Sequence, residues 1–276
     1  MSKGELCEIC PKACVIPEGH KGFCGARTNR EGKIIAANYG KITSMALDPI
    51  EKKPLKRFHP GSYILSVGSY GCNLRCPFCQ NYDISMGNDT TVYLELTPEE
   101  LIARALEQIP RGNIGVAYTY NEPLIGYEFV RDCANLAAEK GLENVVVTNG
   151  YINEKPFAEL LPFIDALNID LKSFSPEFYK SIGGNLETVK TSIRLAAAKS
   201  HVEVTTLVIA GDNDSEEEMR ALSSWLATVN PEIPLHISRF FPAYKMSNRL
   251  PTSVKTIRDL VEIAQESLRY VYTGNI

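Results

Sequence analysis

Residues 71–81 read GCNLRCPFCQN and place three cysteines, Cys72, Cys76 and Cys79, within eight residues of one another. The stretch directly follows an apolar run at residues 63–69 that is typical of a buried strand. A loop this short can wrap three thiolates around one metal centre, and thiolates bind iron–sulfur clusters or zinc. A structural zinc site is closed by four ligands, so zinc would need a fourth group such as His59. Three ligands instead favour a cubane cluster that leaves one iron free for another ligand.

From residue 63 onwards, short β-branched runs alternate with amphipathic helical stretches. This alternation predicts βα units and a parallel sheet that is covered by helices. Thr97 and Ser215 are each followed three residues later by glutamate, which predicts a capping box at the start of two helices. The six predicted strands are residues 63–69, 114–119, 144–148, 166–171, 202–210 and 235–240.

Polar residues collect at the carboxyl ends of these predicted strands. In parallel βα proteins those ends converge on one face, where the following loops build the active site. The first strand leads into the cysteine loop. The later strands contain or lead into Asn121, Glu122, Thr148, Asn149, Asp170, Lys172, Gly211, Asp212, Asn213, His236 and Arg239. We therefore expect an active site around the cysteine loop.

The composition limits the class of protein. The chain has 276 residues, of which 44% are hydrophobic and 22% charged, as in a soluble protein with a sizeable core. Its formal charge of -4 gives no general attraction for nucleic acid or anionic membranes, and no apolar run has membrane-spanning length. The start lacks the apolar segment of a secretion signal, so we expect a cytoplasmic protein. Its eight cysteines then favour metal binding or reactivity over disulfides.

A second group of cysteines, Cys7, Cys10, Cys14 and Cys24, has the spacing C-x2-C-x3-C-x9-C. This segment has too little apolar content to fold without a metal, which predicts a metal-binding knuckle. The metal is either zinc or a second iron–sulfur cluster that relays electrons to the first. We therefore divide the chain into a cysteine-rich metal-binding extension, residues 1–60, and a core, residues 61–276.

The cysteine spacing after a strand, with Gly71 before it, resembles the signature of the radical S-adenosylmethionine (SAM) superfamily. The resemblance spans about residues 60–250 and implies an α/β fold, a partial (β/α)6 TIM-like barrel. It implies that Cys72, Cys76 and Cys79 hold a [4Fe-4S] cluster whose free iron binds the amino and carboxylate groups of SAM. One electron from the reduced cluster then cleaves the sulfonium, and the resulting 5'-deoxyadenosyl radical abstracts hydrogen from a substrate.

The same resemblance implies roles for residues outside the cysteine loop. Phe78 matches the family's aromatic residue that packs on the adenine. Glu122 in TYNEP falls where relatives have a Gly-Gly-Glu-Pro stretch that holds the amino group. Here Tyr120 and Asn121 replace the two glycines, so the backbone part of that contact does not carry over directly.

Asp170 and Lys172 in NIDLKSF match the Asp-Leu-Lys of glycyl-radical activating enzymes. The match implies contacts to the ribose hydroxyls and to the carboxylate of SAM, which are chemically sensible pairings. The alternative is a surface ion pair between the two side chains. Asn149 and His236 are placed similarly and are also expected to bind the cofactor.

The pieces DPIEKKPL, GCNLRCPFCQN and YTYNEP, with the knuckle before them, resemble pyruvate formate-lyase activating enzyme-like proteins. Within these, the AmmeMemoRadiSam system radical SAM enzymes are the most similar subgroup. Such relatives continue past an ending like YVYTGN with a segment that contains a cysteine pair, and this chain has none. The basic run that follows Glu51, residues 52–57, either contacts substrate or cofactor or forms a solvated loop.

We therefore expect an oxygen-sensitive, anaerobic oxidoreductase that cleaves SAM and abstracts hydrogen from a protein or peptide, as glycyl-radical activating enzymes do. A small-molecule substrate within the AmmeMemoRadiSam system is the alternative. A third reading, from another class, is a non-catalytic iron–sulfur electron carrier or a zinc-stabilised interaction module. The expected partners are the substrate and an electron donor such as flavodoxin or ferredoxin, with no nucleic acid and no membrane.

Overall fold

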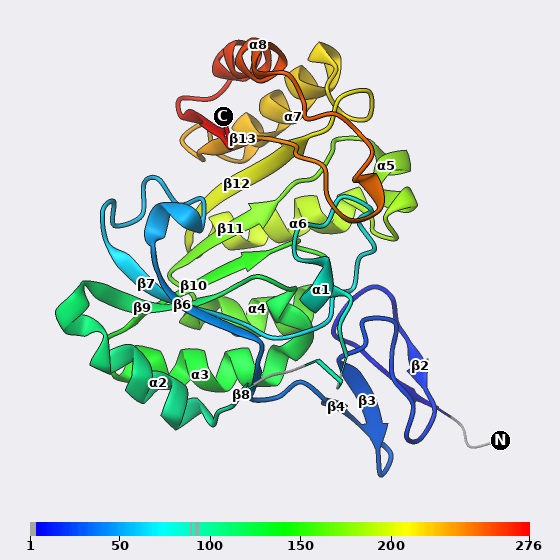
Figure 1. The fold of residues 1–276 in the computed structure, drawn as a ribbon, viewed down its shortest axis with the longest axis vertical. Helices are drawn as coiled ribbons and strands as arrows, with labels where there is room; N and C mark the ends of the chain where they lie inside the picture. The colour runs from blue at the N-terminus through cyan, green and yellow to red at the C-terminus, as the bar shows by residue number, and fades with distance from the viewer. Residues whose placement is uncertain (1–3, 89, 92–93) are drawn as a thin grey trace.

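The computed structural model describes residues 4–88, 90–91 and 94–276, and one eight-stranded sheet forms its centre (Figure 1). Seven strands run parallel, and β6 pairs antiparallel with β7 at one edge. In spatial order the strands are β14 (Val271–Gly274), β13 (Leu235–Arg239), β12 (His201–Val208), β11 (Ala166–Asp170), β10 (Glu143–Thr148), β9 (Asn113–Tyr118), β7 (Tyr63–Gly68) and β6 (Ser44–Pro49). Within the described chain β14 and β6 are not paired with each other, so the barrel is partial.

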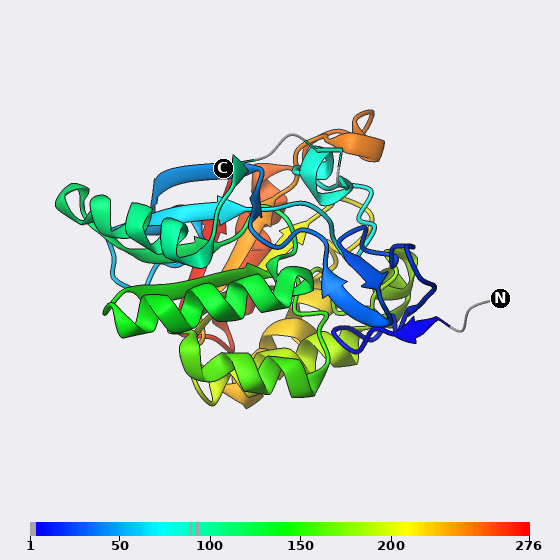
Figure 2. The same ribbon diagram turned by 90° about the horizontal axis from the view of Figure 1, so that it is seen from below.

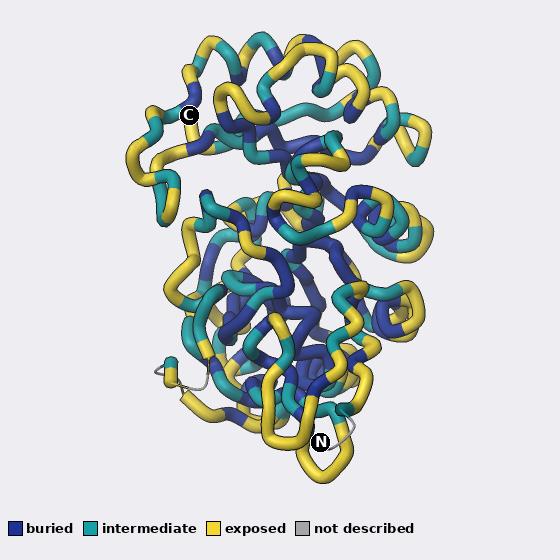
Figure 3. Tube along the Cα trace, turned by 90° about the vertical axis from the view of Figure 1, so that its right-hand side faces the viewer, coloured by how far each residue is buried: buried dark blue, intermediate teal, exposed yellow. Residues whose placement is uncertain are grey.

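Helices connect the parallel strands, and the longer ones lie along the outside of the sheet (Figure 2). They are α1 (Tyr82–Ser85), α2 (Pro98–Glu107), α3 (Tyr127–Glu139), α4 (Glu154–Leu160), α5 (Pro176–Ser181), α6 (Leu186–Ala197), α7 (Glu216–Val229) and α8 (Val254–Gln265). Each longer helix buries one apolar stripe; in α8 the stripe contains Ile257, Leu260 and Ala264. The buried part of the chain therefore runs through the strands and the inner helix faces (Figure 3).

Short elements surround this sheet. Three small antiparallel sheets pair β1 (Glu5–Leu6) with β2 (Val15–Ile16), β3 (Arg27–Arg30) with β4 (Lys33–Ala36), and β5 (Lys41–Ile42) with β8 (Leu94–Glu95). The 3-10 helices are η1 (Ile50–Lys52), η2 (Ile109–Arg111), η3 (Pro123–Gly126), η4 (Leu161–Phe163) and η5 (Tyr244–Met246). No helix in the described ranges is long and apolar enough to cross a membrane.

The six strands expected from the sequence are all confirmed, each within two residues at either end. The capping box at Thr97 is also confirmed, because its side chain and that of Glu100 exchange hydrogen bonds with each other's backbone. The prediction of a second capping box, at Ser215, was wrong in part. Ser215 accepts a hydrogen bond from the amide of Glu218, but the Glu218 carboxylate instead accepts from Ser173 and from the amide of Phe174.

Residues 50–57, which we call the barrel plug, fill the barrel near the amino ends of its strands. Ile50 and Leu55 are fully buried there against apolar residues of β7, β9, β10 and β11. The Pro54 carbonyl accepts a hydrogen bond from Asn168 (2.9 Å), and the amides of Lys56 and Arg57 donate to the carboxylate of Glu203. Strand β6 and the plug lie in the predicted extension, so part of that extension packs as an integral piece of the barrel.

Candidate active site

A cavity of about 270 Å³ lies at the carboxyl ends of the parallel strands. It brings together the three loop cysteines and five of the six residues predicted to bind the cofactor. These eight lining residues are Cys72, Cys76, Phe78, Cys79, Glu122, Asn149, Asp170 and Lys172. They come from the loops after β7, β9, β10 and β11, as the rule for parallel βα proteins requires.

The cysteine loop is held tightly against the N-terminal segment. Gly71 has a φ of +91°, and a Cβ atom there would lie 2.6 Å from the carbonyl oxygen of Cys24. Only glycine fits both the backbone conformation and this close approach. The Cys72 sulfur accepts hydrogen bonds from the amide of Leu74 (3.4 Å) and from the side chain of Asn149 (3.6 Å).

Two of the loop thiols, Cys72 and Cys76, lie in an environment that disfavours a free thiolate. Burial raises the pKa of Cys76 to about 11, although Lys172 opposes the shift, and burial also raises the pKa of Cys72. Bound iron would supply the positive charge that stabilises the thiolates.

Glu122 is a buried carboxylate in the cavity wall. Its Oε1 accepts hydrogen bonds from the Leu124 amide (3.1 Å) and the Thr148 hydroxyl (2.7 Å), and its Oε2 accepts from the Asn149 amide (2.8 Å). Burial raises the pKa of Glu122 to about 7, although these three hydrogen bonds favour the ionised form. A carboxylate offers about four acceptor positions, so one position remains for a donor in the cavity.

Of the two residues that replace the family's glycines, Tyr120 keeps a backbone conformation that glycine would allow. Tyr120 has a φ of +71°, in the left-handed region that glycine adopts without strain. Asn121 accepts a hydrogen bond from the amide of Ser69 (2.9 Å) and donates to the carbonyl of Gly71 (3.1 Å). The turn before Glu122 is therefore tied directly to the start of the cysteine loop.

Asp170 and Lys172 form the ion pair that the sequence left as an alternative, but the pair lies in the cavity wall. The Lys172 ammonium donates to Asp170 Oδ2 (2.8 Å), and the two side chains are 15% and 34% exposed, respectively. Burial alone would lower the pKa of Lys172, but Asp170 raises it above its usual value. Both side chains line the cavity and keep hydrogen-bonding capacity toward it.

His236 does not join this group, contrary to our expectation. It is the second residue of β13, near the amino ends of the strands, where it pairs with buried Glu203 (Nε2 to Oε2, 2.6 Å). Burial alone would raise the pKa of Glu203, but hydrogen bonds from His201, His236 and two backbone amides lower it to about 2. His59, the fourth ligand that a zinc site would need, is also remote from the loop and lies 3.5 Å from Glu143 at the start of β10.

Several residues that line the cavity were not predicted. Thr205 and Leu207 alternate along β12 and so face the same side of the sheet. Because side chains alternate between the two faces of a strand, applying this alternation to the last residues of each predicted strand could have identified Thr205 and Leu207. Other lining residues that were not predicted include Ser85 in α1, Met86 directly after it, Ser238 in β13 and Asn275 after β14.

The four N-terminal cysteines line a small enclosed cavity next to the cysteine loop. Burial raises the pKa of Cys10 to about 11, and Asn73, the neighbour of Cys72, hydrogen-bonds this thiol. Arg75 connects the two segments as well, because it donates to the carbonyls of both Phe23 and Cys72. His20 is exposed and hydrogen-bonds the carbonyl of Glu18, and Cys133 is a fully buried thiol in α3.

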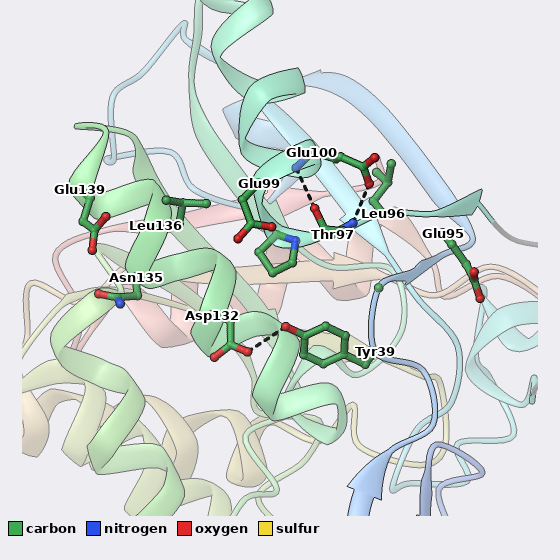
Figure 4. A pocket seen from close by; sticks show the side chains of 12 residues that line it. Tyr39, Glu95, Leu96, Thr97, Glu99, Glu100, Asp132, Asn135, Leu136 and Glu139 are labelled. Atoms are coloured by element: carbon green, nitrogen blue, oxygen red, sulfur yellow. Dashed lines mark hydrogen bonds between the residues drawn. The ribbon is translucent and has the colours of Figure 1, made fainter.

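A larger surface cavity of about 810 Å³ lies between the start of α2 and the second half of α3 (Figure 4). Glu95, Glu99, Asp132 and Glu139 contribute carboxylates to its wall, and Tyr39 donates a hydrogen bond to Asp132 (2.8 Å). Thr97 and Glu100 are occupied with each other in the capping box (Figure 4). This larger cavity is lined by no cysteine and by none of the residues predicted to bind the cofactor. The smaller cavity is therefore the candidate active site.

Comparison with known proteins agrees with this geometry. The sequence profile of the Radical SAM superfamily matches residues 66–225, more than half of the chain. The chain is 42% identical over 276 residues to uncharacterized protein MJ0808 of Methanocaldococcus jannaschii, covering 98% of this chain and 81% of the relative. It is 31% identical over 171 residues to the pyruvate formate-lyase-activating enzyme of Clostridium pasteurianum, covering 58% of this chain and 67% of the relative.

Among solved structures, a radical SAM methyltransferase from Sphaerobacter thermophilus shares the fold, with a TM-score of 0.60 at 18% identity over 78% of this chain and 67% of that chain. The profile match shows that this protein belongs to the radical SAM superfamily. It is an enzyme of the radical SAM type, similar to pyruvate formate-lyase activating enzymes. The family implies a [4Fe-4S] cluster and SAM as cofactors, and three cysteines beside a carboxylate with one open acceptor position fit both groups. These findings contradict the reading as a non-catalytic carrier or interaction module.

Proposed function

We propose that this enzyme uses the radical derived from SAM to abstract hydrogen from a protein or peptide. The observation that carries the proposal is the single cavity that joins Cys72, Cys76 and Cys79 to Glu122 and Asp170. The similarity to an enzyme that, by its name, activates pyruvate formate-lyase supports a protein substrate. Asn275, directly after the edge strand β14, also lines the cavity, which therefore reaches the unpaired edge of the partial barrel, where a loop of another protein could enter.

Nine of the residues that line the cavity have a defined task in this proposal. When bound and reduced, the cluster supplies the electron that cleaves the sulfonium of SAM. Cys72, Cys76 and Cys79 hold the cluster, and Glu122 accepts hydrogen bonds from the amino group of SAM through its open position. Asp170 and Lys172 are assigned to the ribose hydroxyls and to the carboxylate. Phe78, Asn149 and the apolar side chain of Leu207 shape the pocket and exclude water from it.

The test is deuterium transfer. Anaerobically reconstituted enzyme, a chemical reductant and SAM are incubated with a panel of peptides that carry α-deuterated glycine in candidate glycyl loops. Peptide-dependent release of 5'-deoxyadenosine that contains deuterium is the expected result. Cys76→Ala is the matched control for background cleavage. Release that never exceeds the level without peptide would contradict the proposal and favour a small-molecule substrate, the alternative suggested by the AmmeMemoRadiSam-like pieces of the sequence.

The electron source and the N-terminal cysteines complete the proposal. We assign the electron to a one-electron donor such as flavodoxin or ferredoxin, because the cluster must be reduced before each cleavage. We assign a thiolate-bound metal to Cys7, Cys10, Cys14 and Cys24, because all four face one enclosed space. Zinc would make the knuckle a structural support of the cysteine loop, whereas a second cluster would make it an electron relay.

A further inference from the structure

The turn before Glu122 contains an unusual residue. Tyr120 has a φ of +71°, where a side chain is strained because its Cβ approaches the neighbouring carbonyl oxygen. An aromatic residue keeps this conformation only when the surrounding structure holds it there. Gly68 provides the space, because a Cβ at this position would lie 2.9 Å from the Cβ of Tyr120.

The side chain of Tyr120 is anchored by a buried ion pair. Its hydroxyl donates to Asp48 Oδ2 (2.8 Å), and the Lys53 ammonium donates to the same oxygen (2.9 Å). The ammonium also lies 4.7 Å from the centre of the Tyr120 ring, within cation–π range. Asp48 belongs to β6 and Lys53 to the barrel plug, so the anchor connects the plug to a residue that lines the cavity.

Burial distinguishes Lys53 from the lysine beside it. The side chain of Lys53 is 3% exposed, whereas that of Lys52, which contacts the other oxygen of Asp48 at 3.2 Å, is 67% exposed. A buried ion pair can contribute more to geometry than to stability, because its desolvation opposes its attraction. Lys53 therefore does not belong to a solvated basic loop, and the burial of its charge calls for a structural explanation.

That reason lies in what the turn controls. The Glu122 amide donates to the carbonyl of Gly71 (3.3 Å), and the Asn121 side chain bonds the segment just before the cysteine loop. The Tyr120 carbonyl accepts from the side chain of Asn81, which follows the loop (2.8 Å). A change in the backbone at Tyr120 would therefore move Glu122 relative to the cysteines.

We propose that the buried Asp48–Lys53 pair is a positioning device that holds Tyr120 in its left-handed conformation and so aligns Glu122 with the bound SAM. The inference rests on the proposed use of this cavity for SAM. Asp48 and Lys53 act through Tyr120 and do not touch the cofactor. The device replaces the conformational freedom of glycine with a fixed side-chain anchor.

The experiment measures the affinity of cluster-loaded enzyme for SAM. Radiolabelled SAM is titrated anaerobically, and the change that SAM causes in the electron paramagnetic resonance spectrum of the reduced cluster gives a second readout. Lys53→Met removes the cation, Tyr120→Phe removes only the hydroxyl, and Lys52→Met is the matched control at the exposed lysine. Iron content and thermal midpoint are recorded for each variant.

We expect Lys53→Met and Tyr120→Phe to weaken SAM binding roughly tenfold, the loss typical of one hydrogen bond to a charged group. Lys52→Met should stay within twofold of the wild type, and iron content should not change. In a Tyr120→Gly background, Lys53→Met should cause no further loss, because Lys53 acts only through the tyrosine. A purely structural role would lower the thermal midpoint equally in both backgrounds without changing the affinity.

Unchanged affinity in Lys53→Met and Tyr120→Phe would overturn the inference, as would the full additional loss in the Tyr120→Gly background. A wild type that neither binds SAM nor changes its spectrum would remove the assignment of the cavity and this inference with it. A wild type that binds SAM normally but acts on no peptide would contradict only the proposed substrate. The two failures are thus distinguishable.

Discussion

The pKa of Glu122 predicts how SAM binding changes with pH. Burial raises this pKa to about 7 from an ordinary value near 4.5. The ionised carboxylate is the form that accepts a hydrogen bond from the amino group of SAM, so binding must favour loss of the proton from Glu122. The perturbation that isolates this contribution is Glu122→Gln, which removes the titrating group and keeps the length of the side chain.

The magnitude follows from the fraction of ionised carboxylate. With a pKa of about 7, roughly one-eleventh of the Glu122 side chains are ionised at pH 6 and nearly all at pH 8. The contribution of Glu122 to the affinity should therefore rise about tenfold between these pH values, or about 1.4 kcal/mol. The amino group of SAM titrates as well, but it does so equally with both proteins. The ratio of the two dissociation constants, Gln variant over wild type, removes that effect.

The assay is anaerobic equilibrium binding of radiolabelled SAM to cluster-loaded protein at pH 6, 7 and 8. We expect the ratio of dissociation constants to increase about tenfold from pH 6 to pH 8. Glu99→Gln is the control, because Glu99 is an exposed carboxylate in the wall of the larger cavity in Figure 4. A ratio that is the same at all three pH values would refute the assignment of Glu122 as an acceptor for the cofactor.

Three further predictions concern other parts of the molecule. Cys76→Ala should abolish 5'-deoxyadenosine formation while the far-ultraviolet circular dichroism spectrum stays unchanged, because the substitution removes one thiol from a loop and alters no residue of a helix or strand; wild-type turnover would contradict the cluster assignment. Cys7→Ala should lose the metal bound at this site, with the zinc and iron content measured by mass spectrometry deciding which metal it is, and should lower the thermal midpoint; unchanged metal content would exclude the site. Glu203→Gln should lower the free energy of unfolding by about 3 kcal/mol at pH 7, since the pKa of Glu203 is lowered to about 2 in the folded state. That difference should shrink as the pH falls from about 5 to 2, and a urea-unfolding difference that does not depend on pH would contradict it.

The sequence predicted the sheet well because its central strands are nearly continuous apolar runs, which only a sheet covered by helices produces. Strands β6 and β14 were missed because both are edge strands in which polar and apolar residues mix. Cys72, Glu122 and Asp170 were predictable because each follows or ends a strand at its carboxyl end. His236 failed the same rule, since it lies at the start of its strand and not at the end.

The role of Lys53 could not be predicted from the sequence, for a different reason. In the sequence it is one residue of a basic run, and a lysine in such a run is usually solvated. Its burial depends on Tyr120, which meets Asp48 across 72 residues of chain. No local pattern encodes that contact. The left-handed conformation of Tyr120 was equally hidden, because tyrosine does not favour it.

The way in which the barrel plug is held limits how this protein can vary. The plug contacts Asn168 and Glu203 through main-chain atoms, the Pro54 carbonyl and the amides of Lys56 and Arg57. These contacts depend on the position of the backbone and not on the side chains at 56 and 57, so they fix the number of residues between β6 and β7. One inserted or deleted residue would shift both amides and leave the buried carboxylate of Glu203 without its two backbone donors. Among homologues, this segment should resist changes in length.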